Sequence, residues 1–189
     1  AEFSYAAARD AAEAEWTTEP PTEVGTWQVR AKIPETANWA AATGYGTFQI
    51  WDSPEKIYRN FVEIKVSGYT GGVVPLRDYP LMVKYAEGTS PMPGFLYEQV
   101  GSPTGAGMLF VDAEGNQLSY DVDTWNTEGE SIVWVKVPVI AGTDTVITNW
   151  WNVKPGQTAV NNDPREVWTR YAGVWHMNDA ADSSPNNTP

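Results

Sequence analysis

The most constraining feature of the sequence is a regular series of short apolar segments separated by turn residues. The segments cover residues 108–112, 117–125, 131–140 and 145–153, and stretches rich in Gly, Asn and Asp join them. In the second segment Leu118, Tyr120 and Val122 alternate with polar residues, which is typical of a half-buried strand. The third segment is almost entirely apolar, as expected for a strand covered on both faces. Short strands at spacings of about a dozen residues predict an all-β sandwich or barrel.

An earlier block of the chain has its own strands. Residues 26–33 alternate without a break, with Trp27, Val29 and Ile33 on one face, and residues 45–51 predict a second strand. Residues 52–54 then break the pattern. We therefore expect a small β unit over residues 1–52, a β-sandwich over 57–176, and a polar tail or the start of a following domain over 177–189. The alanine-rich residues 5–15 predict a short helix with Ser4 as its N-cap.

Composition excludes several classes of protein. The 189 residues carry 24 acidic groups against 12 Lys and Arg, a formal charge of −12. Nucleic-acid binding requires a basic surface, which this chain lacks. With no cysteine and one histidine, the chain has neither a disulfide framework nor a zinc site. No apolar run approaches the roughly 20 residues that cross a bilayer, so we expect no membrane insertion.

The ten tryptophans are the first candidates for a binding site. Sugar rings stack on flat aromatic surfaces, while neighbouring polar groups bind the hydroxyls. Trp125, Trp134, Trp150 and Trp151 are the candidate glycan-binding residues. Adjacent residues of a strand point to opposite faces, so only one of Trp150 and Trp151 can enter a given core. The alternative is that all four rings pack in the protein, as we expect of the other tryptophans that lie in the motifs described below, Trp39 included.

Acidic residues suggest two further kinds of site. Asp112, Glu114 and Asn116 lie in one predicted turn and could supply oxygen ligands to a cation, for which we consider calcium. A solvated acidic surface accounts equally well for acidic residues at these positions. No other cofactor is expected. Asp121 and Asp123 point the same way from one strand, about 6 to 7 Å apart, a separation that some glycosidases use.

No motif supports an enzyme, however. The sequence has no Gly-x-Ser-x-Gly nucleophile motif and no phosphate-binding loop. His176 has no evident partner, and we expect it to pack between domains. We therefore predict that the chain has no catalytic residues.

Several segments resemble a known family. They are residues 79–84, 107–118, 123–126, 131–138 and 171–176. This part of the chain, about residues 68–176, is similar to a bacterial domain family of unknown function, which usually precedes a concanavalin A-like, laminin G-like domain in large surface or secreted proteins. One departure is Trp150-Trp151-Asn152, which replaces a Tyr-Tyr-Gly-Asn-like segment and lacks the glycine.

The first block resembles the later strands of a bacterial immunoglobulin-like repeat. Residues 25–31, 38–39 and 48–50 carry this weaker similarity. Together the resemblances imply a non-catalytic extracellular module that acts as a structural spacer, adhesion or assembly unit, with neighbouring domains or chains as partners through strand edges. A carbohydrate-binding module is the alternative, and a glycoside-active enzyme fragment the remote one.

Overall fold

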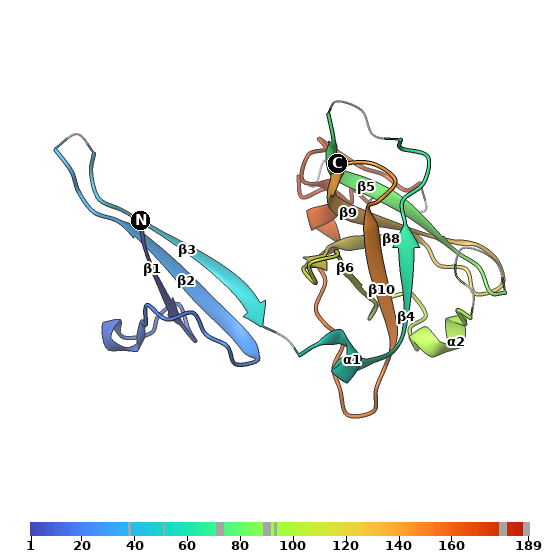
Figure 1. Cartoon of the computed structure of the whole chain (residues 1–189), viewed down its shortest axis with the longest axis horizontal. Coiled ribbons are helices and arrows are strands. Elements are labelled where there is room, and N and C mark those ends of the chain that lie inside the picture. Colours follow the sequence, from blue (N-terminus) through green and yellow to red (C-terminus); the bar gives the residue numbers. More distant parts are fainter. Residues whose placement is uncertain are drawn as a thin grey trace. The chain divides into compact units, whose positions relative to one another are not determined.

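The computed structural model describes residues 1–37, 39–50, 52–70, 74–88, 92, 94–177 and 181–186, with the backbone alone at residue 49. The chain is mostly β-structure and divides into two compact units, Ala1–Ser53 and Pro54–Pro189 (Figure 1). Among the described residues, no helix is long and apolar enough to cross a membrane.

The first unit is one antiparallel sheet of three strands. The strands β1 (Glu2–Ala6), β2 (Gly25–Ile33) and β3 (Ala42–Ile50) lie in the order β1-β2-β3. The two strands expected from the alternation are therefore present as β2 and β3, although Trp51, at the end of the second, lies outside the described residues.

The helix expected over residues 5–15 is wrong. Residues 2–6 pair with β2, and only the short 3-10 turn η1 (Glu13–Glu15) is helical. Pairing along an existing strand satisfies the backbone of residues 2–6, and this tertiary gain outweighs the high intrinsic helix propensity of alanine over so short a segment. Ser4 does not cap a helix; its hydroxyl accepts a hydrogen bond from Arg30 Nε at 3.1 Å.

The covered face of this sheet is the one that carries Arg30. Arg30 is only 6% exposed, and its guanidinium lies 4.4 Å from the centre of the Trp16 ring. The guanidinium also donates to both carboxylate oxygens of Glu13, at 2.6 and 3.0 Å. The apolar face remains half open, since Phe3 is 54% and Ile33 50% exposed.

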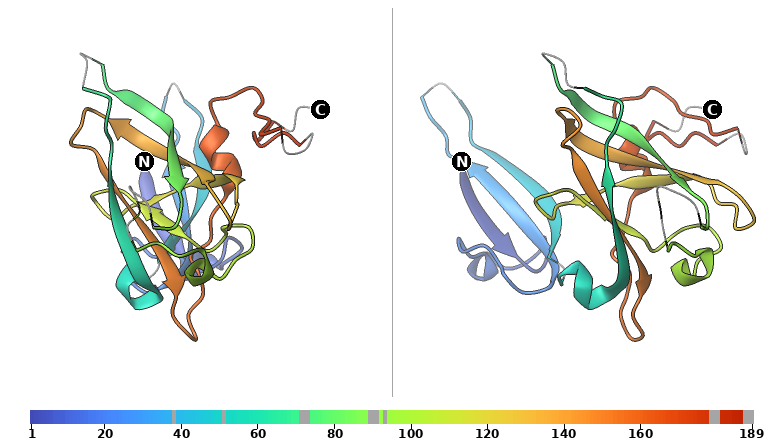
Figure 2. Two further views of the ribbon diagram at one scale, coloured as in Figure 1. Left: turned by 90° about the vertical axis from the view of Figure 1, so that its right-hand side faces the viewer. Right: turned by 45° about the vertical axis from the view of Figure 1, so that its right-hand side comes forward.

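The second unit contains two antiparallel sheets that share a core (Figures 1 and 2). One has the order β4 (Tyr58–Lys65), β10 (Val146–Val153), β6 (Leu109–Val111), β7 (Gln117–Leu118). The other has the order β5 (Leu76–Tyr85), β9 (Ser131–Ile140), β8 (Tyr120–Thr124). Three short helical segments complete the unit: α1 (Pro54–Ile57), α2 (Tyr97–Val100) and the 3-10 segment η2 (Pro164–Trp168). The segments expected over residues 108–112, 131–140 and 145–153 form β6, β9 and β10, whereas the single strand expected over 117–125 is divided into β7 in one sheet and β8 in the other.

The core is aromatic and contains one buried amide. Phe95 packs against Tyr85 and Trp151, with ring centres 5.0 and 5.6 Å away. Asn149 is fully buried; its amide oxygen accepts from the Tyr85 hydroxyl at 3.1 Å, and its amide nitrogen donates to the Leu109 carbonyl at 3.2 Å. Because Tyr85 belongs to β5 and Asn149 to β10, this satisfied amide links the two sheets through the core.

Candidate functional site

The chain that follows β10 returns across the outer face of the β5-β9-β8 sheet. The segment η2 contacts all three of these strands, and Figure 1 shows it in orange-red beside β9. Pro164 and the Asp163 carboxylate, which accepts from the Arg165 amide, start η2. This return brings Trp168 and His176 to side chains of β8 and β9 that lie far away in the sequence.

Five of these side chains form a polar cluster, which we call the His176 cluster: Asp121, Asp123, Trp134, Trp168 and His176. One oxygen of Asp121 accepts from Trp168 Nε1 at 2.7 Å and lies 2.8 Å from His176 Nε2. One oxygen of Asp123 accepts from Trp134 Nε1 at 3.0 Å and lies 3.3 Å from His176 Nδ1. The side chains of His176, Asp121 and Asp123 are only 14%, 12% and 18% exposed. The cluster is therefore a largely buried arrangement of one imidazole between two carboxylates.

The electrostatics of the cluster favour a charged imidazole. The hydrogen bond to Asp121 is the main reason that the pKa of His176 is raised; the negative charges of Asp121 and Asp123 add to it and burial opposes it. An imidazolium donates from both ring nitrogens, which matches the two carboxylate oxygens that face them. Since neither nitrogen is left to accept a proton from a nucleophile, the geometry suits holding rather than proton transfer.

The prediction that His176 lacks partners is therefore wrong. Asp121 is 55 positions away in the sequence, and no local pattern marks this pairing. The sequence contains one indication of the cluster: Asp121 and Asp123 lie two positions apart on one predicted strand and therefore on the same face of it. The sequence does not indicate that the C-terminal segment returns over that sheet.

Further contacts attach the same segment. Arg170 forms an ion pair with Asp78 at 2.8 Å, and Lys136 donates to the Thr169 hydroxyl at 2.8 Å. The rings of Trp134 and Trp168 meet edge to face, with centres 5.7 Å apart. The attachment thus combines charge, hydrogen bonding and aromatic packing along residues 168–176.

The residues expected to form a polar tail are also bonded. One oxygen of Asp182 accepts from the backbone amides of Val174 and Ser184, at 2.8 Å each. Asn186 donates to the Tyr171 carbonyl at 2.9 Å. Residues 181–186 therefore fold back against residues 171–174, while residues 178–180 and 187–189 lie outside the described part of the chain.

The four candidate tryptophans do not form an exposed platform. Trp151 is 3% exposed in the core and donates to Gln99 at 3.1 Å. Trp150 is 8% exposed on the opposite face of β10. Trp125 packs against core aromatics, and Trp134 belongs to the His176 cluster. Their rings therefore contribute mainly to packing.

The exposed aromatic surface lies on other residues. Phe61 of β4 is 57% exposed and stacks on Trp150, with ring centres 4.6 Å apart at 29°. Arg59 and Glu63 share its strand face and are exposed. In the first unit, Trp39 is 74% exposed, so the expectation that it packs is wrong. Phe61 was not predicted as a glycan-binding residue because the candidates were all tryptophans.

The turn that was predicted to bind a cation is stabilised by hydrogen bonds among its own residues. One oxygen of Asp112 accepts from the backbone amides of Glu114 and Asn116, at 3.0 and 2.8 Å, and the other accepts from the Asn116 side chain at 2.9 Å. Asp112 thus caps its own hairpin turn. Within the described ranges, no three or more Asp, Glu, His or Cys residues gather in a group suited to a metal ion.

Comparison with known proteins gives one match. Residues 104–186 match the model of a family described as a domain of unknown function, DUF2341. This range contains β6 to β10, η2 and the whole His176 cluster. No curated protein matches the chain, and no solved structure matches it.

Proposed function

We propose that the chain is a non-catalytic module of a large exported bacterial protein, in which it serves as a spacer or assembly unit at the cell exterior. The observation that carries the proposal is the attachment of residues 163–186 to the sandwich through the His176 cluster. A segment held by buried ionic, hydrogen-bond and aromatic contacts keeps a fixed direction relative to the sheet beneath it. A spacer needs this property if it is to orient a domain that follows it.

The same geometry argues against glycoside hydrolysis. That reaction requires one carboxyl group that exchanges a proton with the substrate and a second that reacts with the sugar or with water. Here Asp121 and Asp123 each accept an indole N–H and face the same imidazole. Because both carboxylates are engaged in these contacts, they are suited to stabilising the fold rather than to reacting with a sugar.

Hydrogen exchange tests the holding role. We expect Trp168→Phe, which keeps an aromatic ring but replaces the indole and removes its N–H, to raise amide exchange in residues 163–177 about tenfold while β5 and β9 keep their protection. His176→Gln should act in the same direction. Glu128→Gln, in an exposed turn, is the matched control. Unchanged exchange of residues 163–177 in both cluster variants would refute the holding role.

Glycan recognition is a second candidate, and Phe61 favours it. Its exposed ring is backed by Trp150 and flanked by charged side chains, an arrangement that suits stacking on a sugar. A glycan array with the intact chain decides between the two functions. Hits that Phe61→Ala abolishes, and that Tyr79→Ala on the other sheet leaves intact, would support glycan binding and overturn a purely structural role. An array without hits supports the spacer.

A further inference from the structure

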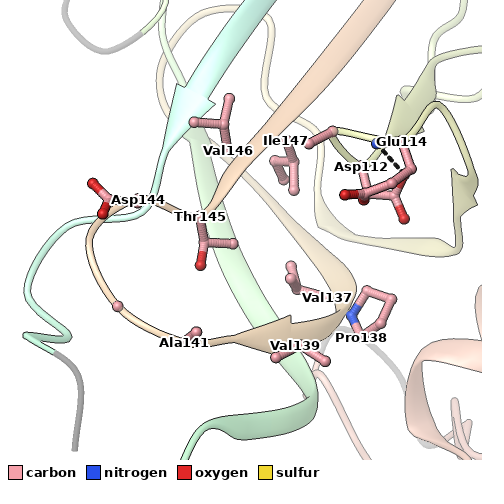
Figure 3. Close-up of a pocket in the computed structure, with 12 residues that line it drawn as sticks. Asp112, Glu114, Val137, Pro138, Val139, Ala141, Asp144, Thr145, Val146 and Ile147 are labelled. Carbon is pink, nitrogen blue, oxygen red and sulfur yellow. Dashed lines mark hydrogen bonds between the residues drawn. The ribbon is translucent and has the colours of Figure 1, made fainter.

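A hollow of about 520 Å³ opens at one corner of the second unit (Figure 3). Three parts of the chain surround it: the turn after β6, the end of β9, and the connection from β9 into β10. The lining residues in these parts are Asp112 to Glu114, Val137 to Val139, and Ala141, Gly142 and Asp144 to Ile147. None of them belongs to the His176 cluster.

The hollow exists because both sheets lose a neighbouring strand at this corner. The β8 strand pairs with β9 only along residues 132–135, and a bond from the Lys136 amide to the Ser119 carbonyl follows at 2.9 Å. On the other sheet, β6 pairs with β10 only along residues 148–150. Among the described residues, the end of β9 and the start of β10 therefore have no strand paired at their inner edges, and the turn at Asp112 closes the third side of the hollow.

The walls combine apolar and acidic groups. Pro138, Val139 and Val146 supply the accessible apolar wall, and Val139 is 39% exposed; Val137 and Ile147 lie behind them in the core, 2% and 1% exposed. The acids are Asp112 and Glu114 on one side and Asp144 on the other, where Figure 3 shows its carboxylate turned outward. The described lining contains no basic side chain that could neutralise these three carboxylates.

We propose that this hollow binds a lysine or arginine side chain carried by a basic, otherwise apolar segment of a partner protein. Charge complementarity is the argument: the rim is acidic, and the whole chain has a charge of −12. Lysine and arginine join an aliphatic stem to a cationic head. The stem contacts Val139 and Val146, and the head binds Glu114 and the lone pairs that remain on Asp112.

Two other occupants fit the hollow less well. A partner strand added to β9 would meet Pro138, which has no N–H to donate, so recognition rests on a side chain rather than on a backbone ladder. A sugar would find no aromatic ring among the lining residues. This inference goes beyond the proposed function and does not depend on the His176 cluster.

Titration of the isotope-labelled full chain with three peptides tests the proposal. The probe alternates lysine with valine; one control peptide alternates glutamate with valine and the other serine with valine. We expect only the lysine peptide to bind and to shift the amide signals of Glu114, Val139 and Ile147. The proposal is overturned if these shifts are absent, or if the serine peptide produces equal shifts. Binding of a neutral oligosaccharide at the same residues would also overturn it.

Two variants separate the hollow from the general negative field of the protein. The double variant Glu114→Gln, Asp144→Asn should weaken binding of the lysine peptide about tenfold. The matched control Glu98→Gln, Glu128→Gln removes the same charge from exposed positions outside the hollow and should change binding less than about twofold. Equal losses in the two double variants would show a non-specific attraction and refute the site.

The apolar wall has its own test. Val139→Ser shortens the contact for the aliphatic stem at a partly exposed position, so the fold should tolerate it. It should weaken the lysine peptide about threefold and leave the charge dependence intact. If Val139→Ser has no effect on binding, the stem contact, and with it this mode of recognition, is wrong.

Discussion

Among the described residues of the first unit the largest deeply buried side chain is Arg30, whereas the second unit buries a continuous cluster of aromatic and aliphatic side chains between two sheets. Ala6 is the one apolar side chain of the first unit that is buried among the described residues. The described residues of this unit form a single three-stranded sheet with no second layer, which cannot exclude water from a large apolar face. It is held instead by Arg30, Glu13 and Trp16. One chain therefore uses two kinds of stabilisation, an apolar core in the second unit and a charged cluster in the first.

The largest expected effect tests the apolar core. Trp151→Ala removes a core ring that contacts Phe95 and bonds to Gln99, and should lower the free energy of unfolding of the second unit by about 3–5 kcal/mol. Amide signals of β2 should keep their own unfolding midpoint, as followed by NMR in denaturant. Loss of both units at one new midpoint would show that the units unfold together and that their stabilities are not separate.

The next effect tests the charged cluster of the first unit. Arg30→Met keeps the aliphatic stem over the sheet and removes the guanidinium that binds Glu13 and faces Trp16. We expect the thermal midpoint of β2 to fall by several degrees and the second unit to be unchanged. Lys32→Met is the matched control, since Lys32 binds the same carboxylate but is 43% exposed. An equal fall in the thermal midpoint of both variants would show that Arg30 stabilises the first unit no more than Lys32 does.

High pH should loosen the second unit at the His176 cluster. The pKa of His176 is raised in the folded chain, so the stability from its charged form is fully present below the unfolded value of 6.5 and is lost as pH rises through the raised value. Amide exchange in residues 163–177, corrected for its intrinsic pH dependence, should increase over that range. His176→Gln should abolish this dependence; a dependence that survives the substitution would have another source.

Acid should loosen the first unit. The hydrogen bonds from Arg30 and then Lys32 lower the pKa of Glu13 to about 2. Its contribution is therefore present above the unfolded value of 4.5 and is lost as pH falls toward 2. Glu13→Gln should remove this acid-dependent step from the unfolding midpoint of β2, measured by NMR between pH 5 and about 2. We expect the smallest effect here because Glu13 is 72% exposed.

Several strands of the second unit could be predicted because their signal is local. Alternation and turn residues within ten positions identify β8, β9 and β10. The His176 cluster could not be predicted, since its geometry depends on a long-range return of the chain. Asp112 is intermediate: the sequence marked its turn correctly, and the structure uses the carboxylate to cap that turn.

The sequence by itself determined that the chain is all-β, because side-chain periodicity and turn residues act over a few positions. It also determined the acidic net charge of −12. The tertiary structure decided the features that depend on distant partners. Pairing with β2 made residues 2–6 a strand rather than a helix, and the sheet beneath residues 163–177 gave His176 its two carboxylates. Such contacts satisfy backbone and charged groups across the fold, and no local pattern encodes which distant residue will do so.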